Sequence, residues 1–427
     1  MKIIQLCGQL SIGGVTQYIS SLNDGFKENN HDVTVYYFQN EKNMKSHEYY
    51  ENIIPGIKLY DYSEEALENI NSADVVCVNV IMQEKTPKIY SEKFNKLISE
   101  DINGPIKVLF MNNHMTIGYK NYYPSDMLTN KTFLDIFDKF VTFSKDSVVY
   151  EKIKQTLGKE EALKKYVQMQ TPYKFNDDIK NNWLSIKEKA KRISYIGRWS
   201  GIKHPQFLLD IHKHPNNKFE TEMRGITRSI GVAAIPDLFY EINSQPGKSF
   251  KESIVGPSKF TTIISNKWFD EMHLDKSDLL LEYPRNGKMF IFGPYKREDG
   301  LKAMSKASYC MDLFRLRKAN AYGDNLEYVI YETIEQGTIP LLDYFTGENV
   351  KMHENGESTD KSMLELNAGI FLKPDLSNLD KVIEQMEYLY NNEDEYNKFR
   401  LNCYEVLKKH SDAKAVSQKM LDEIIKA

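Results

Sequence analysis

Two cations in one loop of the sequence could bind a diphosphate. Arg198 and Lys203 fall in a glycine-containing stretch between an apolar run at 193–196 and a helical pattern near 208–212. A guanidinium offers a planar fork of donors and an ammonium a point charge, and both suit phosphate oxygens. A solvated basic loop would have the same composition, but turns from strand to helix are where doubly wound folds bind ligands. We therefore expect Arg198 and Lys203 to contact phosphate.

A carboxylate further along the chain is suited to a ribose. Glu332 lies in the apolar helical pattern 328–334, which ends at Gly337 before a buried run at 339–342. A carboxylate in such surroundings is costly without a partner, and a ribose diol can donate two hydroxyl protons to it. Glu327 stands near the start of the same helix, and Asp324 precedes it. A pair of surface glutamates is the alternative, which the apolar surroundings disfavour.

Two polar loops in the first third of the chain are further candidates. Gly13, Gly14 and Val15 follow the apolar run 1–7, and paired glycines let a backbone approach a phosphate or a sugar. The spacing matches neither a P-loop nor the dinucleotide fingerprint, so a tight turn chosen for its geometry is the favoured explanation of this stretch taken by itself. His114 follows the run 108–111 and could hydrogen-bond a sugar hydroxyl, although a lone histidine is more often structural.

Basic residues outnumber acidic ones in the stretch 285–318. A local positive face of this kind can neutralise a phosphate backbone even in a protein whose net charge is −4. A solvated helical face is nearly as good an explanation of the charge alone. The candidate contacts are Lys296, Arg297, Lys302 and Lys306.

Strand and helix patterns alternate along the chain and predict the elements that position these residues. Such alternation is typical of parallel sheets with helices on both faces. We predict an α/β protein with two Rossmann-like, doubly wound domains facing a central cleft. The first domain covers 1–171, a linker 172–191, and the second domain 192–411 with an insertion near 240–281; the helix 412–427 is a candidate to pack back on the first domain. Ser144 is expected to cap a helix that begins at Lys145.

Composition restricts the class of protein. The four cysteines are widely scattered, which argues against a disulfide framework or a zinc ribbon and fits a reducing cytoplasm. No window is apolar enough for a membrane span, and the run 1–7 is too short for a secretory signal. No cluster of metal ligands with suitable spacing is present, so we expect no metal requirement.

Together these stretches resemble a known family of enzymes. The Gly13-Gly14-Val15 loop, Arg198 with Lys203, and the Glu332 helix ending in Gly337-Thr338-Ile339-Pro340 are similar to retaining glycosyltransferases of the GT-B type, which have two Rossmann-like domains. Such enzymes carry two acidic residues eight apart on the donor side, here Asp324 and Glu332. A closer resemblance is to the DNA α-glucosyltransferases of T-even bacteriophages. It is carried most specifically by Leu326-Glu327-Tyr328, by the Gly337–Pro340 run, and by Thr346-Gly347-Glu348-Asn349.

The resemblance implies a reaction and roles for these residues. The family transfers glucose from UDP-glucose to the hydroxymethyl group of 5-hydroxymethylcytosine in duplex DNA and retains the α configuration. It implies that His114 and Glu327 are catalytic and that the basic stretch holds DNA while the target base is flipped out. The residues implied to bind the donor are Gly13, Gly14, Val15, Arg198, Lys203, Asp324 and Glu332. The family has a His-Asp pair where this chain has Asn113-His114.

Two other functions fit parts of the same pattern. A bacterial glycosyltransferase that makes a surface polysaccharide or teichoic acid from a UDP-sugar would share the donor site, but it usually has a basic amphipathic helix for the membrane, and none is clear here. A non-catalytic module that binds nucleotide sugar or DNA is the other possibility. The presence of Arg198, Lys203 and Glu332 argues against it.

Overall fold

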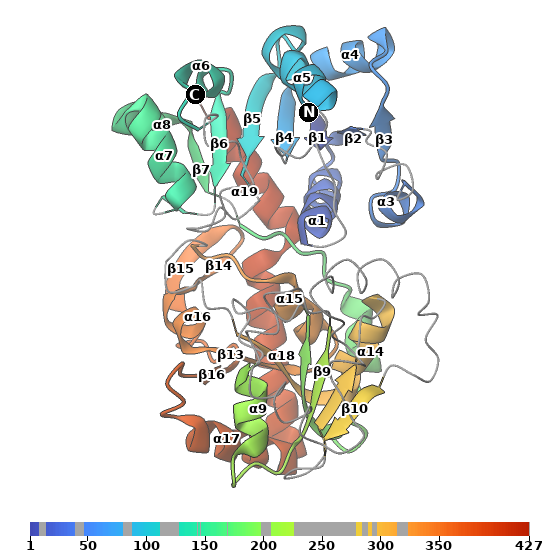
Figure 1. Cartoon of the computed structure of the whole chain (residues 1–427), viewed down its shortest axis with the longest axis vertical. Coiled ribbons are helices and arrows are strands. Elements are labelled where there is room, and N and C mark those ends of the chain that lie inside the picture. The colour runs from blue at the N-terminus through green and yellow to red at the C-terminus, as the bar shows by residue number, and fades with distance from the viewer. Residues whose placement is uncertain are drawn as a thin grey trace, which may run out of the picture.

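The computed structural model contains two parallel-stranded α/β units, one above the other in the view of Figure 1. It describes residues 1–7, 14–38, 47–79, 88–111, 128–142, 144–145, 147–168, 170–197, 206–225, 279–283, 289–292, 297–313 and 323–426. The predicted α/β class with two doubly wound units is confirmed. The exact domain bounds stay predictions.

The first unit is a seven-stranded parallel sheet in the order β3-β2-β1-β4-β5-β6-β7. Apolar side chains on both faces explain the continuous apolar runs of the sequence, since each face is covered by helices. The strands are β1 (Lys2–Cys7), β2 (Asp32–Phe38), β3 (Lys58–Tyr60), β4 (Val75–Asn79), β5 (Ile106–Phe110), β6 (Lys139–Thr142) and β7 (Tyr166–Gln168).

The helices of this unit follow its strands in chain order. They are α1 (Gly14–Glu28), α3 (His47–Ile53), α4 (Glu64–Asn71), α5 (Lys88–Lys96) with a π-helical turn at Leu97–Asp101, α6 (Lys131–Asp135), α7 (Val148–Leu157) and α8 (Lys159–Lys165). The expected cap at Ser144 was wrong. Helix α7 begins at Val148, and the side chain of Ser147 accepts from the backbone N–H of Tyr150. Both serines are capable caps, and the later one has the geometry.

The second unit has seven strands in the order β10-β11-β9-β8-β12-β13-β16, with only the edge pair β10–β11 antiparallel. The last residues of the expected insertion, from Leu279, belong to β10. The strands are β8 (Ala190–Ile196), β9 (Glu220–Arg224), β10 (Leu279–Tyr283), β11 (Met289–Phe292), β12 (Ala307–Asp312), β13 (Ile339–Asp343) and β16 (Ile370–Leu372), with a separate hairpin of β14 (Lys351–Glu354) and β15 (Glu357–Ser362).

Helices cover this second sheet on both faces, and two long ones run back toward the first unit. Helices α9 and α17 pack on one face and α14 on the other. The helices are α9 (Gln206–Lys213), α14 (Arg297–Lys306), α15 (Tyr328–Glu335), α16 (Tyr344–Asn349), α17 (Leu379–Asn391), α18 (Glu393–Ser411) and α19 (Ala413–Ile425), with a 3₁₀ turn at Asp177–Asn182.

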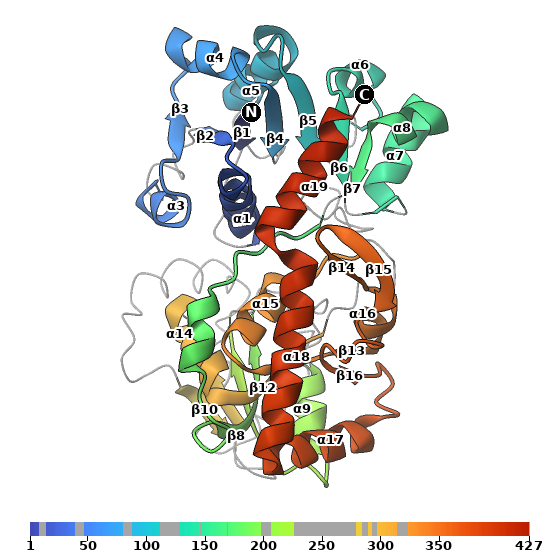
Figure 2. The same ribbon diagram turned by 180° about the vertical axis from the view of Figure 1, so that it is seen from behind.

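Helix α19 completes the first unit although it comes last in the chain. Figure 2 shows α18 lying along the second unit and α19 continuing from it onto the first. Val416, Met420, Leu421 and Ile424 of α19 are buried in the same apolar cluster as the α1 side of the first sheet. The close approach depends on Gly25 of α1, because a Cβ there would lie 2.1 Å from the carbonyl oxygen of Ala413.

Candidate functional site

Helix α15 carries Glu332, with Glu327 as its N-cap residue and Asp324 in the segment before it. Glu327 has the extended backbone of an N-cap residue, with φ −75° and ψ 146°. Ile330 and Ile334 are buried on the face toward the core. The helix ends before Gly337, whose φ of +66° favours glycine. A Cβ at Gly337 would also lie 2.5 Å from Trp183, so glycine is required here twice over.

The first turn of α15 meets the start of α1 from the other unit. A Cβ at Gly14 would lie 3.8 Å from Cδ2 of Tyr328, which is ordinary van der Waals contact. The Tyr328 side chain packs against apolar clusters of both units, and its hydroxyl donates to the carbonyl of Pro172 at 3.0 Å. Two helix N-termini, with their positive dipole ends, are thus brought together from the two units. Such a place favours an anionic ligand.

Glu332 has a protein partner, Arg297, at the first residue of α14. Arg297 donates through Nε at 2.9 Å and Nη2 at 2.8 Å, both to Oε1 of Glu332. Only 16% of the Glu332 side chain is exposed, against 51% for Arg297. Burial raises the pKa of Glu332, and Arg297 partly offsets that rise. The pair places a carboxylate and a guanidinium side by side, an arrangement that can accept from hydroxyls and donate to phosphate.

The acidic residue eight positions earlier, Asp324, is bound within the second unit. His353 Nε2 lies 2.9 Å from Oδ2 of Asp324, and the backbone N–H of Lys351 donates to Oδ1 at 3.0 Å. His410 donates from Nε2 to the Asp324 carbonyl at 2.8 Å. Burial alone would raise the pKa of Asp324, but the hydrogen bonds from His353 and Lys351 hold it below its ordinary value. Asp324 therefore attaches the segment before α15 to the β14–β15 hairpin.

The other candidates of the basic stretch separate into two groups. Lys302 and Lys306 are exposed on α14, while Arg297 of the same helix is engaged with Glu332.

Val15, a further candidate from the first unit, is half-buried and packs against the apolar cluster under α1. Five predicted site residues lie outside the described part of the chain. These are Gly13, His114, Arg198, Lys203 and Lys296.

The sequence did not predict two residues, Tyr328 and Tyr173, that the structure places where α15 meets the first unit. Tyr328 joins the two units, and Tyr173 stacks on Tyr331 with ring centroids 5.2 Å apart and planes at 26°. The available signal was the pair of tyrosines at positions 328 and 331, three apart on one helix face. Nothing local predicts that one of them reaches the other unit.

Within the described ranges, no group of three or more histidine, cysteine, aspartate or glutamate side chains could hold a metal ion. None of the helices described is long and apolar enough to cross a membrane.

Comparisons with known proteins found a curated relative and solved structures that match nearly the whole chain. No protein-family model matches it. The DNA alpha-glucosyltransferase of Enterobacteria phage T4 is 23% identical over 429 residues, which span 97% of this chain and 96% of that protein. A solved alpha-glucosyltransferase in complex with UDP-glucose and DNA containing an abasic site aligns with a TM-score of 0.74, 20% identity and coverage of 100% and 99% of the two chains.

A further alpha-glucosyltransferase structure, in complex with UDP and a 13-mer DNA containing a HMU base, aligns with a TM-score of 0.72 and 19% identity over 100% of both chains. The resemblance expected from Leu326-Glu327-Tyr328 and the run after Gly337 is therefore confirmed at the level of the whole chain. The chain has the GT-B fold and is similar, from end to end, to the DNA alpha-glucosyltransferase of Enterobacteria phage T4.

Proposed function

We propose that this chain is a retaining glucosyltransferase that moves glucose from UDP-glucose to the hydroxymethyl group of 5-hydroxymethylcytosine in DNA. The observation that carries the proposal is the end-to-end similarity, in sequence and in fold, to enzymes with this chemistry. Those solved structures hold UDP-glucose with DNA, and UDP with DNA containing a HMU base. A donor nucleotide sugar and a hydroxymethylated pyrimidine acceptor are the substrates that this likeness supports.

The donor half of the site lies on the second unit. Glu332 accepts from the ribose hydroxyls, and Arg297 beside it donates to the nucleotide. Arg198 and Lys203 bind the diphosphate and stabilise the charge of the leaving group. The facing N-termini of α1 and α15, with Gly14 on one side, favour the same anion.

Two carboxylates near the start of α15 take different roles in this proposal. Glu327, at the N-cap position, is assigned to contact the glucose. Asp324 occupies the place where the family has its first acidic residue, but its carboxylate is already bound by His353 and by the Lys351 N–H. We assign it the task of orienting the loop that precedes α15. Its effect on the sugar is therefore indirect.

The acceptor half belongs to the first unit and the basic face. A base in duplex DNA must leave the stack to reach a site between two units. His114 contacts the sugar from the first unit, and Lys296, Lys302 and Lys306 hold the DNA backbone. Retention without a protein nucleophile implies that the acceptor hydroxyl attacks from the face that the phosphate leaves. The departing phosphate takes the acceptor proton.

The protein is proposed to act without a metal and without a membrane, in the cytoplasm of the cell whose DNA it modifies. Buried Cys7, Cys77, Cys310 and Cys403 are all free thiols, which agrees with a reducing compartment. The charge on the diphosphate is then balanced by protein cations and helix N-termini alone.

A transfer assay tests the proposal directly. UDP-glucose is incubated with the protein and duplex DNA containing cytosine, 5-hydroxymethylcytosine or 5-hydroxymethyluracil, and the nucleosides are analysed by mass spectrometry. We expect a hexose on the hydroxymethylated DNA and none on cytosine. UDP binding without transfer to any of the three duplexes would overturn the assignment of DNA as the acceptor and would favour a surface glycan instead.

A further inference from the structure

The segment that joins the two units, residues 171–176, lies along the whole length of α15. Before the helix, Thr171 Oγ1 donates to the carbonyl of Leu326 at 3.2 Å. At its first turn, the Tyr328 hydroxyl donates to Pro172 O at 3.0 Å. Further along, the ring of Tyr173 stacks on the helix. We call residues 171–176 the crossing segment; it is attached to the helix that carries Glu332.

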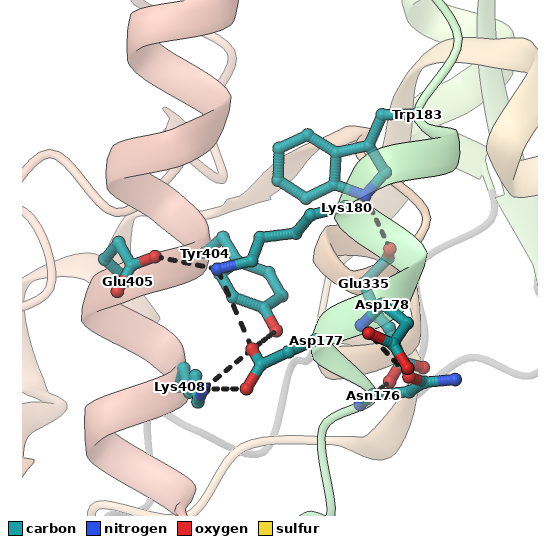
Figure 3. A network of polar contacts seen from close by, with 9 residues as sticks. All are labelled: Asn176, Asp177, Asp178, Lys180, Trp183, Glu335, Tyr404, Glu405 and Lys408. Carbon is teal, nitrogen blue, oxygen red and sulfur yellow. Dashed lines mark hydrogen bonds and ion pairs between the residues drawn. The ribbon is translucent and has the colours of Figure 1, made fainter.

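Glu335, in the last turn of α15, binds the end of the crossing segment through Tyr173 and Asn176. Its Oε2 accepts from the Tyr173 hydroxyl at 2.8 Å, and its Oε1 accepts from the backbone N–H of Asn176, also at 2.8 Å. Its carbonyl accepts from Trp183 Nε1 at 2.8 Å, and Figure 3 shows Asn176 and Trp183 on either side of it. The residue is 6% exposed. Burial raises its pKa, while the bonds from Asn176 and Tyr173 act in the opposite direction and favour the carboxylate.

Tyr173 also fixes the second connection between the units. Its backbone N–H donates to Ser411 O at 2.7 Å, and its carbonyl accepts from the Ala413 N–H at 3.2 Å. Ser411 and Ala413 flank the junction of α18 with α19, which is the second connection between the units. The crossing segment and this junction therefore meet at Tyr173. Two side-chain hydrogen bonds then join this meeting point to α15, one from the Tyr173 hydroxyl to Glu335 and one from the Ser411 hydroxyl to the hydroxyl of Tyr331.

We propose that Glu335 is a positioning residue, which locks α15 to the crossing segment and so holds the start of α15 against Gly14 of the first unit. This inference rests on the proposed function, because it concerns the geometry of the same transfer. Glu335 is one turn beyond Glu332 on the helix and touches no substrate in this scheme. Its loss shifts one half of the site relative to the other, while the donor groups on the second unit stay intact. A displacement of about 1 Å can cost on the order of a hundredfold in rate.

The test uses four full-length variants. Glu335→Ala removes both acceptors, Glu335→Gln restores one, and Tyr173→Phe removes only the hydroxyl donor. Asp177→Asn is the matched control, because Asp177 is on the same stretch but bonds to Tyr404 and Lys408 of α18. We expect kcat for glucose transfer to fall about tenfold in Glu335→Ala, and less in the other two, with the Kd for UDP within about twofold of wild type. Asp177→Asn should match wild type.

Hydrogen exchange supplies a readout that needs no acceptor. Amides in the first turns of α1 and α15 should exchange faster in Glu335→Ala and Tyr173→Phe than in wild type or Asp177→Asn. Unchanged exchange in both variants would overturn the inference, as would a loss of UDP affinity that accounts for the whole loss of rate. If wild-type protein transfers no glucose, the proposed function fails, and the exchange result alone decides the role of Glu335.

Discussion

Arg297 and Glu332 form an ion pair across 35 positions of sequence, with both guanidinium contacts converging on one carboxylate oxygen. The other oxygen of Glu332 has no part in that pair, so the carboxylate can serve a ligand and the arginine together. Glu332→Ala should weaken UDP binding by about tenfold to a hundredfold. Titration calorimetry with UDP measures this. The melting temperature should change little, because Arg297 is half exposed and water can solvate it once its partner is gone. Wild-type affinity in the variant would remove Glu332 from the donor site.

Removing Arg297 should change the pH dependence of UDP binding. Glu332 must be ionised to accept from two hydroxyls, so affinity is present above its pKa and is lost as pH falls through it. Its pKa is already raised by burial, and Arg297 limits that rise. In Arg297→Ala the loss of affinity should therefore begin at a higher pH than in wild type. Kd values for UDP measured between pH 5 and pH 8 test the shift, and superimposable profiles would contradict it.

The exposed lysines of α14 should contribute to DNA affinity in a salt-dependent way. Lys302→Ala and Lys306→Ala should each lower the slope of log K against log salt concentration by about one, because each removes one phosphate contact. UDP affinity should not change. Lys381→Ala is the control, because Lys381 is an exposed lysine on α17, which packs on the opposite face of the second sheet from α14. Fluorescence anisotropy with a labelled duplex at several salt concentrations gives the slopes. Equal slopes in all four proteins would exclude α14 from the DNA interface.

Gly25 and Gly14 lie on the same helix, α1, but substitution by alanine should change the stability of the protein differently at the two positions. At Gly25 a Cβ would lie 2.1 Å from the Ala413 carbonyl and 2.6 Å from the Ser417 hydroxyl, whereas at Gly14 the nearest atom of the described residues, Cδ2 of Tyr328, is at 3.8 Å. Gly25→Ala should destabilise the protein by about 1–3 kcal/mol, because α19 must shift. Gly14→Ala should leave the unfolding free energy nearly unchanged. Urea denaturation compares the two, and equal midpoints would show that α19 does not depend on this contact.

The buried amine of Lys189 should make stability rise with pH above neutrality. It donates to the carbonyls of Ser305 and Ala307 and to the hydroxyl of Thr338. Burial, with a smaller effect of Arg400, lowers its pKa to about 7. Between pH 7 and the unfolded value, the unfolded chain binds the proton more tightly, so the unfolding free energy increases by up to about 1.4 kcal/mol per pH unit. Lys189→Met should remove that increase, and urea denaturation at pH 7, 8 and 9 measures it.

Transfer should not depend on a divalent metal. The proposed site balances the diphosphate with protein cations and helix N-termini. Glucose transfer after dialysis against EDTA should equal transfer in untreated protein, and adding Mg²⁺ or Mn²⁺ back should not increase it more than about twofold. A large loss of rate that Mg²⁺ or Mn²⁺ restores would require a metal at the diphosphate.

The sequence predicts local features of this protein well because they are local in origin. The apolar runs that became β1, β4 and β13 reflect burial on both faces of a sheet. The stop of α15 at Gly337 reflects a backbone conformation that glycine tolerates. Even the wrong cap, Ser144 for Ser147, displaced a helix start by only one turn.

The contacts that assemble the site could not be predicted from the sequence. Arg297 looked like one more basic residue of a charged stretch, and only the packing of α14 beside α15 gives it Glu332 as a partner. Asp324 matched a donor-side position in spacing, but its carboxylate is bound by His353 from a hairpin further along the chain. Pairings over such separations depend on how whole elements pack, and composition and periodicity contain no record of them.

The position of α19 has a consequence for synthesis on the ribosome. Residues 1–168 contain every strand of the first sheet, yet Val416, Met420 and Leu421 of its core are translated only after the second unit. The nascent first unit must therefore wait, with the part of its α1 face that α19 covers still exposed, while the entire second unit is made. A premature stop shortly before residue 413 would leave that face open in a released chain, and such chains should aggregate or be degraded even though no strand is missing.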